Sequence, residues 1–228
     1  MPYCIRPMHK EDIDQVTEID REVFPTQWPP DNYRHELENQ LARYVVACDG
    51  TKTPEKPEVI PYPEKVPQGL AAGLKGWLNH NRLFGNELPP PNRQTVAGFA
   101  GIWVLADEAH ITNIAVRKRY QRQGIGELLL IAIADLSAEL KASIITLEVR
   151  ASNTTAQNLY LKYGFTQVGL RHAYYTDNRE DGLIMSTESI TAASFQSRLK
   201  QLKQAHSRRW GSANYQLAKN HPAQPDRR

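Results

Sequence analysis

Apolar residues recur along this chain in two patterns, in short compact stretches and at a spacing of three or four residues. The short stretches predict strands over 3–8, 43–49, 95–105, 110–116, 143–149, 165–170 and 181–185. The longer spacing predicts helices over 11–23, 31–41 and 153–163, and another that opens at Gly126. Because strands and helices alternate in the second half, the pattern is typical of an α/β protein with a mixed sheet.

Residues 50–94 interrupt this pattern. Prolines stand at 54, 57, 61, 63, 67 and 89–91, which leaves no regular element at either end of the segment. A weak apolar patch lies between them, at Leu70, Leu74, Trp77 and Leu78. We expect a partly irregular, Pro-rich insertion between two strands of one domain, which spans residues 1–189.

The chain becomes polar and basic towards its end. From Ser189 onward it has eight Lys or Arg and one acidic residue, a net charge of +7, whereas the whole chain carries +3 and the preceding residues therefore −4. We expect residues 190–228 to form a basic C-terminal extension, partly disordered or helical. A solvated tail, a helix docked on the domain through Phe195, Leu199 and Leu202, and a nucleic-acid contact are all compatible with it.

Composition bears on the cellular location of the protein and on the kinds of site it can contain. No run of about 18 apolar residues occurs, so we expect no membrane span. The first seven residues are too polar and too broken by proline for a signal peptide. The two cysteines, Cys4 and Cys48, lie in separate strand-like stretches, which indicates buried thiols and a reducing cytoplasm. The seven histidines show no metal-ligand spacing, so we expect no metal site.

A glycine turn is the clearest candidate for a binding site. Ile114, Ala115 and Val116 end a predicted strand, and the segment from Gln121 to Gly126 then leads into a helix. The segment consists of Gln121, Arg122, Gln123, Gly124, Ile125 and Gly126. Glycines let successive backbone N–H groups converge on one anion, and the helix N-terminus adds partial positive charge. Arg117, Lys118, Arg119 and Arg122 add formal positive charge nearby.

Taken alone, this turn is also compatible with a basic surface connection. It lacks the third glycine of a dinucleotide-binding fingerprint, since Leu129 stands there, and it lacks the Lys-Ser/Thr pair of a P-loop. The pattern therefore argues against a dinucleotide or a nucleoside triphosphate as the anion.

Further motifs add a resemblance. Gln121-x-x-Gly124-x-Gly126 after a strand resembles the pyrophosphate-binding signature of the GNAT superfamily of acetyltransferases. The segments 146–153, 158–165, 171–175 and 179–181 resemble the ribosomal-protein-alanine N-acetyltransferases within it. The resemblance covers about residues 3–187 outside 50–94 and is densest from Glu108 to Met185. It implies a GNAT fold, in which a mixed, mostly antiparallel twisted sheet is flanked by helices on both faces.

The resemblance also implies a site for acetyl-CoA. The backbone of Ile114, Ala115 and Val116 would pair with the pantetheine arm, the turn from Gln121 to Gly126 would hold the pyrophosphate, and Asn153 would contact the cofactor arm. Glu148 would be the general base, and Tyr160 the general acid for the departing thiolate. Phe24, Trp28, Tyr174 and Tyr175 are candidates for lining the acceptor groove.

The residues themselves allow these roles without requiring them. Glu148 shares a strand face with Thr146 and Arg150, so it can face a cleft, although a surface ion pair would explain it equally. Tyr160 lies on the apolar face of its helix, which also suits a core aromatic with a satisfied hydroxyl.

The acceptor stays open at this stage. An α-amine, with a pKa of about 7.7–8.0, is partly neutral at pH 7, whereas a lysine at about 10.4 is harder to deprotonate by roughly 3.5 kcal/mol. Deprotonation of a protein N-terminus therefore costs the site less free energy than deprotonation of a lysine. The resemblance implies a ribosomal protein as the partner. Thr176 stands where the family has a proline after the paired tyrosines, which keeps a lysine, a polyamine or a small amine as alternatives. A catalytically inactive module that only binds acyl-CoA or RNA would not need Glu148 and Tyr160, so the presence of both residues argues against such a module.

Overall fold

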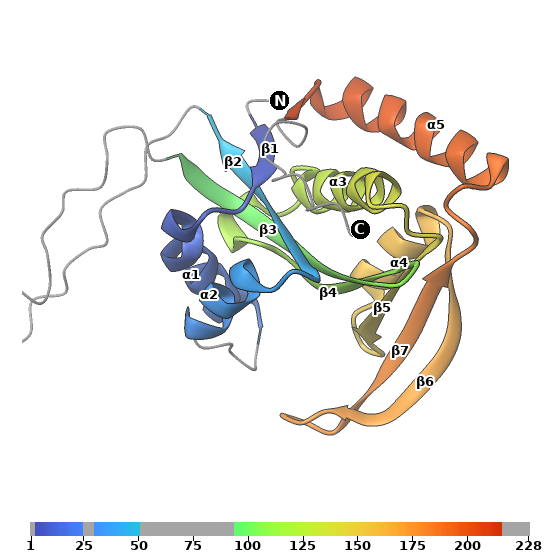
Figure 1. Ribbon diagram of the computed structural model, residues 1–228, viewed down its shortest axis with the longest axis horizontal. Helices are drawn as coiled ribbons and strands as arrows, with labels where there is room; N and C mark the ends of the chain where they lie inside the picture. Colours follow the sequence, from blue (N-terminus) through green and yellow to red (C-terminus); the bar gives the residue numbers. More distant parts are fainter. Residues whose placement is uncertain (1–2, 25–29, 51–93, 216–228) are drawn as a thin grey trace, which may run out of the picture.

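The computed structural model describes residues 3–24, 30–50 and 94–215. They form an α/β fold in which one sheet carries helices on both faces (Figure 1). The strands are β1 Tyr3–Pro7, β2 Ala42–Asp49, β3 Thr95–Leu105, β4 Glu108–Val116, β5 Ile144–Arg150, β6 Phe165–Tyr175, β7 Glu180–Thr187 and β8 Asn214–Tyr215. The helices are η1 Lys10–Asp12, α1 Ile13–Val23, α2 Pro30–Glu38, η3 Lys118–Tyr120, α3 Ile125–Glu139, α4 Thr154–Lys162 and α5 Ala193–Trp210.

The sheet has eight strands in the order β6-β7-β5-β4-β3-β2-β1-β8. Neighbouring strands are antiparallel except for two pairs, β4 with β5 and β1 with β8. β3 is buried without a break from Thr95 to Ile102, because both of its faces are covered by helices. The mixed, mostly antiparallel GNAT-type sheet expected from the sequence is confirmed.

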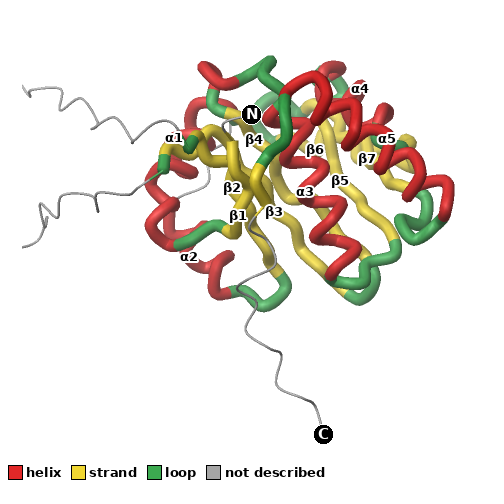
Figure 2. The backbone as a smooth tube through the Cα atoms, turned by 90° about the horizontal axis from the view of Figure 1, so that it is seen from above, coloured by secondary structure: helices red, strands yellow, loops and turns green. Residues whose placement is uncertain are grey.

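Two layers of helices bury the two faces of the sheet. α1 and α2 cover one face, in a cluster that includes Val16, Ile19, Tyr33, Val46 and Phe99. α3 and α4 cover the other face, and α5 lies over α3 (Figure 2). No helix in the described ranges is long and apolar enough to cross a bilayer.

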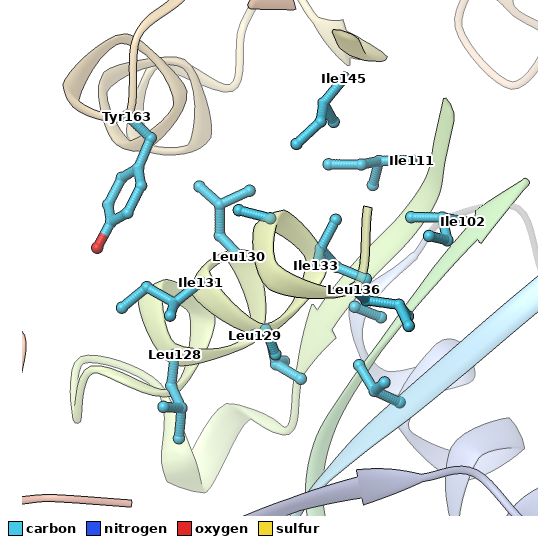
Figure 3. Packing of buried hydrophobic residues seen from close by; sticks show 14 of the residues in the cluster. Ile102, Ile111, Leu128, Leu129, Leu130, Ile131, Ile133, Leu136, Ile145 and Tyr163 are labelled. Carbon is cyan, nitrogen blue, oxygen red and sulfur yellow. The ribbon is translucent and has the colours of Figure 1, made fainter. Parts of the chain in front are cut away.

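α3 is apolar on all sides because it lies between two layers. Every residue from Leu128 to Ala134 is buried (Figure 3). One side of the helix faces β2, β3 and β4, and the other faces α5. A helix that is apolar all round needs such double cover. Phe195 and Leu199 of α5 complete the same core.

The basic segment therefore has a structural role over Ala193–Trp210, where a helix is docked on the domain. The sequence left this arrangement open as one of three. Residues 216–228 and the expected Pro-rich insertion, apart from its ends at residues 50 and 94, lie outside the described residues.

Several boundaries differ from the expectation. β6 runs to Tyr175 instead of ending near Leu170, and most of its residues are exposed, so no apolar alternation marks its length. The second helix begins at Pro30, so Asp31 lies inside the helix and not at its cap. β8, which has two residues, was not expected from the sequence at all.

We expect Leu199→Ala to lower the free energy of unfolding by about 2–4 kcal/mol, because it opens a cavity between α5 and α3. Leu199 is only 5% exposed, whereas its neighbour Lys200 is exposed. Urea unfolding of Leu199→Ala, with Lys200→Ala as the matched control, measures the difference. Equal midpoints for the two variants would show that α5 is not packed on α3 in solution.

Candidate active site

The two parallel strands β4 and β5 separate at one end of the sheet. Their pairing runs from Glu108 opposite Ile144 to Ile111 opposite Leu147 and goes no further within the described residues. The last five residues of β4, Thr112–Val116, thus keep only β3 as a neighbour, and their edge towards β5 is open. We call this opening the fork. The backbone of Ile114, Ala115 and Val116, expected to meet a pantetheine arm, lines it.

A bulge explains why the strands part here. Gly101 of β3 pairs with Asn113, while the next residue, Ile102, pairs with Ile111, so Thr112 is an extra residue in β4. A bulge bends its strand and increases the twist. Gly101 makes room on the neighbouring strand, since a Cβ there would lie 2.4 Å from the Tyr44 ring.

Glu148 follows directly after the last β5 residue that pairs with β4. Its neighbours Leu147 and Val149 are buried in the core with α3, so the Glu148 side chain points to the opposite face of the sheet. The carboxylate is only 9% exposed and has a partner on each oxygen. His110 Nε2 lies 3.1 Å from Oε2, and Arg171 Nε lies 3.0 Å from Oε1.

His110 connects Glu148 to a second carboxylate. The Thr146 hydroxyl donates to Glu108 Oε1 at 2.5 Å and lies 2.9 Å from His110 Nδ1. Because the hydroxyl has one proton and gives it to Glu108, Nδ1–H must be the donor to Thr146.

The sequence did not identify His110 as a site residue. The only available signal was its register: His110 pairs with Thr146, two residues before Glu148, on the adjacent parallel strand. Sequence patterns predict strands but do not fix the register between distant ones.

Tyr160 lies on the other side of the sheet, on α4, in the same core cluster as α3. Its ring packs against Phe165 at 5.6 Å between centroids. Burial, with a contribution from Tyr175, raises the pKa of Tyr160, so the hydroxyl keeps its proton at neutral pH. Tyr163 differs, because its hydroxyl donates to Glu127 Oε1 at 2.8 Å. The Tyr160 hydroxyl donates to no group in the described part of the chain, so its proton is available to a ligand.

The glycine turn presents bare backbone donors at the start of α3. Gly124 is the N-cap of the helix with φ 78°, a left-handed conformation that glycine adopts at no steric cost. The N–H groups of Gly124, Ile125 and Gly126 donate to no acceptor among the described residues. Donors left free at a helix N-terminus fit a pyrophosphate.

Two glutamine side chains of the turn stabilise it through hydrogen bonds to preceding backbone carbonyl groups. Gln121 Nε2 donates to Val116 O at 3.0 Å, and Gln123 Nε2 donates to Arg119 O at 3.1 Å. Arg122 stays exposed on the turn, with φ 62°. Arg117 does not belong to the rim of the turn as expected, because its guanidinium is paired with Glu18 of α1 at 3.0 Å.

Asn153 caps α4, its Oδ1 accepting from Ala156 N at 3.1 Å. The cap satisfies one of the free N–H groups at the helix start. Asn153 is exposed and lies at the carboxyl end of β5, so its Nδ2 group remains on the same edge as the fork.

The candidate acceptor residues fall into two groups. Tyr174 and Tyr175 pack edge to face at 5.2 Å on β6. Arg171, which is paired with Glu148, lies 5.5 Å from the centre of the Tyr174 ring. Burial, and to a lesser degree the charge of Glu148, raises the pKa of Tyr174. Phe24 lies elsewhere, against the cluster of α1 and α2. Trp28 is outside the described residues.

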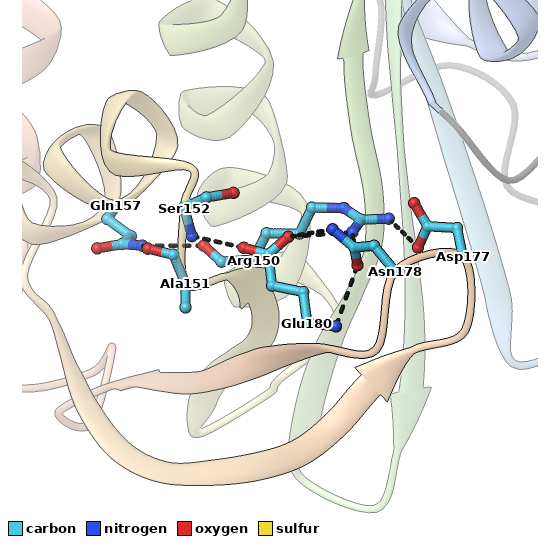
Figure 4. Close-up of polar contacts among 7 residues, drawn as sticks. All are labelled: Arg150, Ala151, Ser152, Gln157, Asp177, Asn178 and Glu180. Carbon is cyan, nitrogen blue, oxygen red and sulfur yellow. Dashed lines mark hydrogen bonds and ion pairs between the residues drawn. The ribbon is translucent and has the colours of Figure 1, made fainter.

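A polar cluster fixes the turn between β6 and β7 next to β5 (Figure 4). Arg150 donates to Asp177 at 2.8 Å and to Glu180 at 3.2 Å, and its guanidinium lies 3.9 Å from the centre of the Tyr175 ring. Hydrogen bonds from Ser152, supplemented by Asn178 and Arg150, lower the pKa of Glu180 to about 2. The cluster therefore stays charged at neutral pH and holds Tyr175 beside the end of β5.

No group of three or more His, Cys, Asp or Glu in the described ranges is arranged to hold a metal ion. The arrangement instead offers a turn with free N–H groups, an open strand edge, a protonated tyrosine on one face, and on the other a buried carboxylate paired with a partly exposed imidazole. These features suit transfer of a group from a long phosphorylated carrier to an acceptor.

Comparisons with known proteins agree with this geometry. Residues 61–165 match the model of the Acetyltransferase (GNAT) family. The putative [ribosomal protein bS18]-alanine N-acetyltransferase of Bacillus subtilis (strain 168) is 36% identical over 184 residues, which cover 80% of this chain and 93% of that protein. The N-alpha-acetyltransferase of Sulfurisphaera tokodaii is 31% identical over 186 residues, 81% of this chain and 92% of that protein.

A solved structure shows the same fold. The ribosomal-protein-S18-alanine N-acetyltransferase from Escherichia coli superposes with a TM-score of 0.59 at 25% identity, covering 84% of this chain and 96% of that one. With the fork, the turn and these relatives together, the chain belongs to the GNAT family of acetyl-CoA-dependent N-acetyltransferases.

Proposed function

We propose that this protein transfers the acetyl group of acetyl-CoA to the α-amine of a protein N-terminus, and that the acceptor is the N-terminal alanine of the small-subunit ribosomal protein bS18. The observation that carries the proposal is the fork: Glu148 follows the last residue of β5 that pairs with β4, and Tyr160 lies in the core on the other face of the sheet. The names of the relatives from B. subtilis and E. coli support the acceptor.

In the proposal, acetyl-CoA binds on the face of the sheet that carries α3 and α4. The free N–H groups of Gly124, Ile125 and Gly126 would hold the pyrophosphate. The open edge of β4 at Ile114–Val116 would pair with the pantetheine arm, as a strand pairs with a neighbour. Acetyl-CoA supplies an activated thioester, and the chain's task is to orient its carbonyl carbon in the fork.

The acceptor side is the face that carries Glu148. In the reaction the amine nitrogen bonds to the thioester carbon, the carbon–sulfur bond breaks, and the amine loses a proton. We assign that proton to the carboxylate of Glu148, which is paired with His110. Tyr160 donates its proton to the sulfur that leaves. After the products dissociate, Glu148 releases its proton to solvent and Tyr160 takes one up, so protons balance over the cycle.

An α-amine suits this site better than a lysine. Its pKa is lower by about 2.5 units, which corresponds to roughly 3.5 kcal/mol less free energy for deprotonation. Tyr174 lies beside Arg171, the ion-pair partner of Glu148, and Tyr175 packs against Tyr174, so these rings would contact the first residues of the acceptor.

Contact with RNA through the tail is a separate and weaker hypothesis. Lys203 is paired with Asp135 of α3, so part of the charge is used within the fold. A cytoplasmic location would follow from a ribosomal acceptor.

Two peptides test the acceptor. One has a free N-terminal alanine and blocked lysines, and the other has a blocked N-terminus and free lysines. We expect mass spectrometry to show acetylation of the first peptide alone, and Glu148→Gln to reduce the rate on it by about a hundredfold. Acetylation confined to the lysine peptide would refute the N-terminal assignment and favour the lysine alternative.

We expect Tyr160→Phe to lower kcat by about a hundredfold, because the thiolate then leaves without a proton donor. The affinity for acetyl-CoA should stay near that of the wild type, since only one oxygen is removed. Steady-state kinetics and calorimetry measure the two effects. Tyr163→Phe is the matched control on the same helix, and a wild-type kcat in Tyr160→Phe would exclude Tyr160 from the reaction.

We expect Arg150→Gln to raise KM for the peptide about tenfold, a loss of about 1.4 kcal/mol, because Tyr175 and the β6–β7 turn lose their anchor. KM for acetyl-CoA should change little, as the glycine turn is untouched. Arg179→Gln, an exposed change on the same turn, is the control. Equal increases in both KM values would mean that Arg150 supports the whole fold and not the acceptor side.

A further inference from the structure

The end of α5 covers the glycine turn. A Cβ placed on Gly124 would lie 2.6 Å from Trp210 Nε1 and 2.7 Å from Cδ1, so the indole rests directly on this glycine. His206, buried on the same helix, has its Nε2 atom 3.0 Å from Gly124 O. The turn that holds the pyrophosphate in the proposed function is thus in contact with a helix that follows the last long strand.

Trp210 has a surface available to a ligand. It is half-buried, and its Nε1–H donates to no acceptor in the part of the chain that the structure describes. The guanidinium of Arg209, which is itself exposed, lies 4.9 Å from the centre of the ring. Tyr3 and Tyr120, the aromatic residues on the other side of the turn, are buried at 7% and 3% exposure.

An indole with a guanidinium stacked on it suits a nucleotide. Any nucleobase can stack on an aromatic side chain, and the arginine guanidinium binds phosphate through two N–H donors in one plane. The adenosine of CoA is bonded to the pyrophosphate itself, so a pyrophosphate on Gly124 brings the base and its 3′-phosphate close to the turn. Among the described residues that touch the turn, Trp210 is the aromatic side chain left partly open.

We propose that Trp210 and Arg209 bind the nucleotide end of acetyl-CoA, with the indole against the adenine ring and the guanidinium on the 3′-phosphate. This inference rests on the proposed function, because it requires the pyrophosphate to lie on the glycine turn. It gives α5 a role in binding in addition to its packing on α3.

Calorimetric titration with truncated ligands tests the assignment without measuring turnover. The ligands are CoA, dephospho-CoA, which lacks the 3′-phosphate, and 4′-phosphopantetheine, which lacks the nucleotide. We expect Trp210→Ala to weaken CoA binding about tenfold and to leave 4′-phosphopantetheine binding unchanged. Trp210→Phe, which keeps an aromatic ring, should stay within about threefold of the wild type.

Arg209→Gln should weaken CoA but not dephospho-CoA, since only CoA has the 3′-phosphate. Lys200→Gln, an exposed change on the same helix, is the matched control and should affect none of the ligands. Thermal unfolding of each variant checks that the fold is intact.

Unchanged CoA affinity in Trp210→Ala would overturn the proposal. An equal loss for CoA and 4′-phosphopantetheine would also overturn it, because Trp210 would then only shape the turn. Binding of CoA with the expected pattern but no acetylation of either peptide would leave this inference standing and refute the proposed acceptor. A wild-type protein that binds none of the ligands would refute both.

Discussion

The partial pairing of β4 with β5 is the constraint on which the rest of the site depends. The two strands are hydrogen-bonded up to Ile111 and Leu147 and then part. A fully paired strand has no free backbone to offer and leaves no passage between the faces of the sheet. The fork leaves β4 backbone free beside Glu148, which follows the last paired residue of β5, while Tyr160 lies in the core on the other face of the sheet. Because the two strands are parallel, the glycine turn and the Asn153 cap also gather at the same edge.

The second constraint is the position of α3 between two apolar layers. Its N-terminal turn can present bare N–H groups only if the helix itself does not shift. The sheet holds α3 from one side, and Phe195 and Leu199 of α5 hold it from the other. At the N-terminus the contacts of His206 and Trp210 with Gly124 continue that support. Stability of the core and geometry of the anion site therefore depend on the same helix.

Local patterns predicted the fold well, because periodicity and glycine positions are local signals. The limits of β3 were predicted as Thr95–Leu105, and the structure has the same limits. The role of the Ile114–Val116 backbone was expected only through resemblance to a family, and the fork itself was not predicted, since no local pattern shows where two strands part. The roles of Glu148 and Tyr160 remain proposals.

What the sequence did not predict depends on contacts between distant segments. His110 meets Glu148 through the register of two parallel strands, and Arg117 turns from the glycine turn to Glu18 of α1. Neither contact can be predicted from the spacing of residues along the sequence. The C-terminal segment was compatible with a solvated tail, a docked helix or an RNA contact, and only the packing of Phe195 and Leu199 in the core decides for the docked helix.

The two sides of the fork differ in how they handle protons, and this difference bears on the acceptor. Tyr160 lies in an apolar core where burial favours its neutral form, so it can only give a proton. Both oxygens of Glu148 are already engaged, one by Arg171 and the other by His110. In the proposed reaction, the proton that Glu148 takes from the amine would pass along the existing hydrogen-bonded chain through His110 towards Thr146 and Glu108. Such a chain suits an amine that is already partly neutral at pH 7, as an N-terminal α-amine is and a lysine is not.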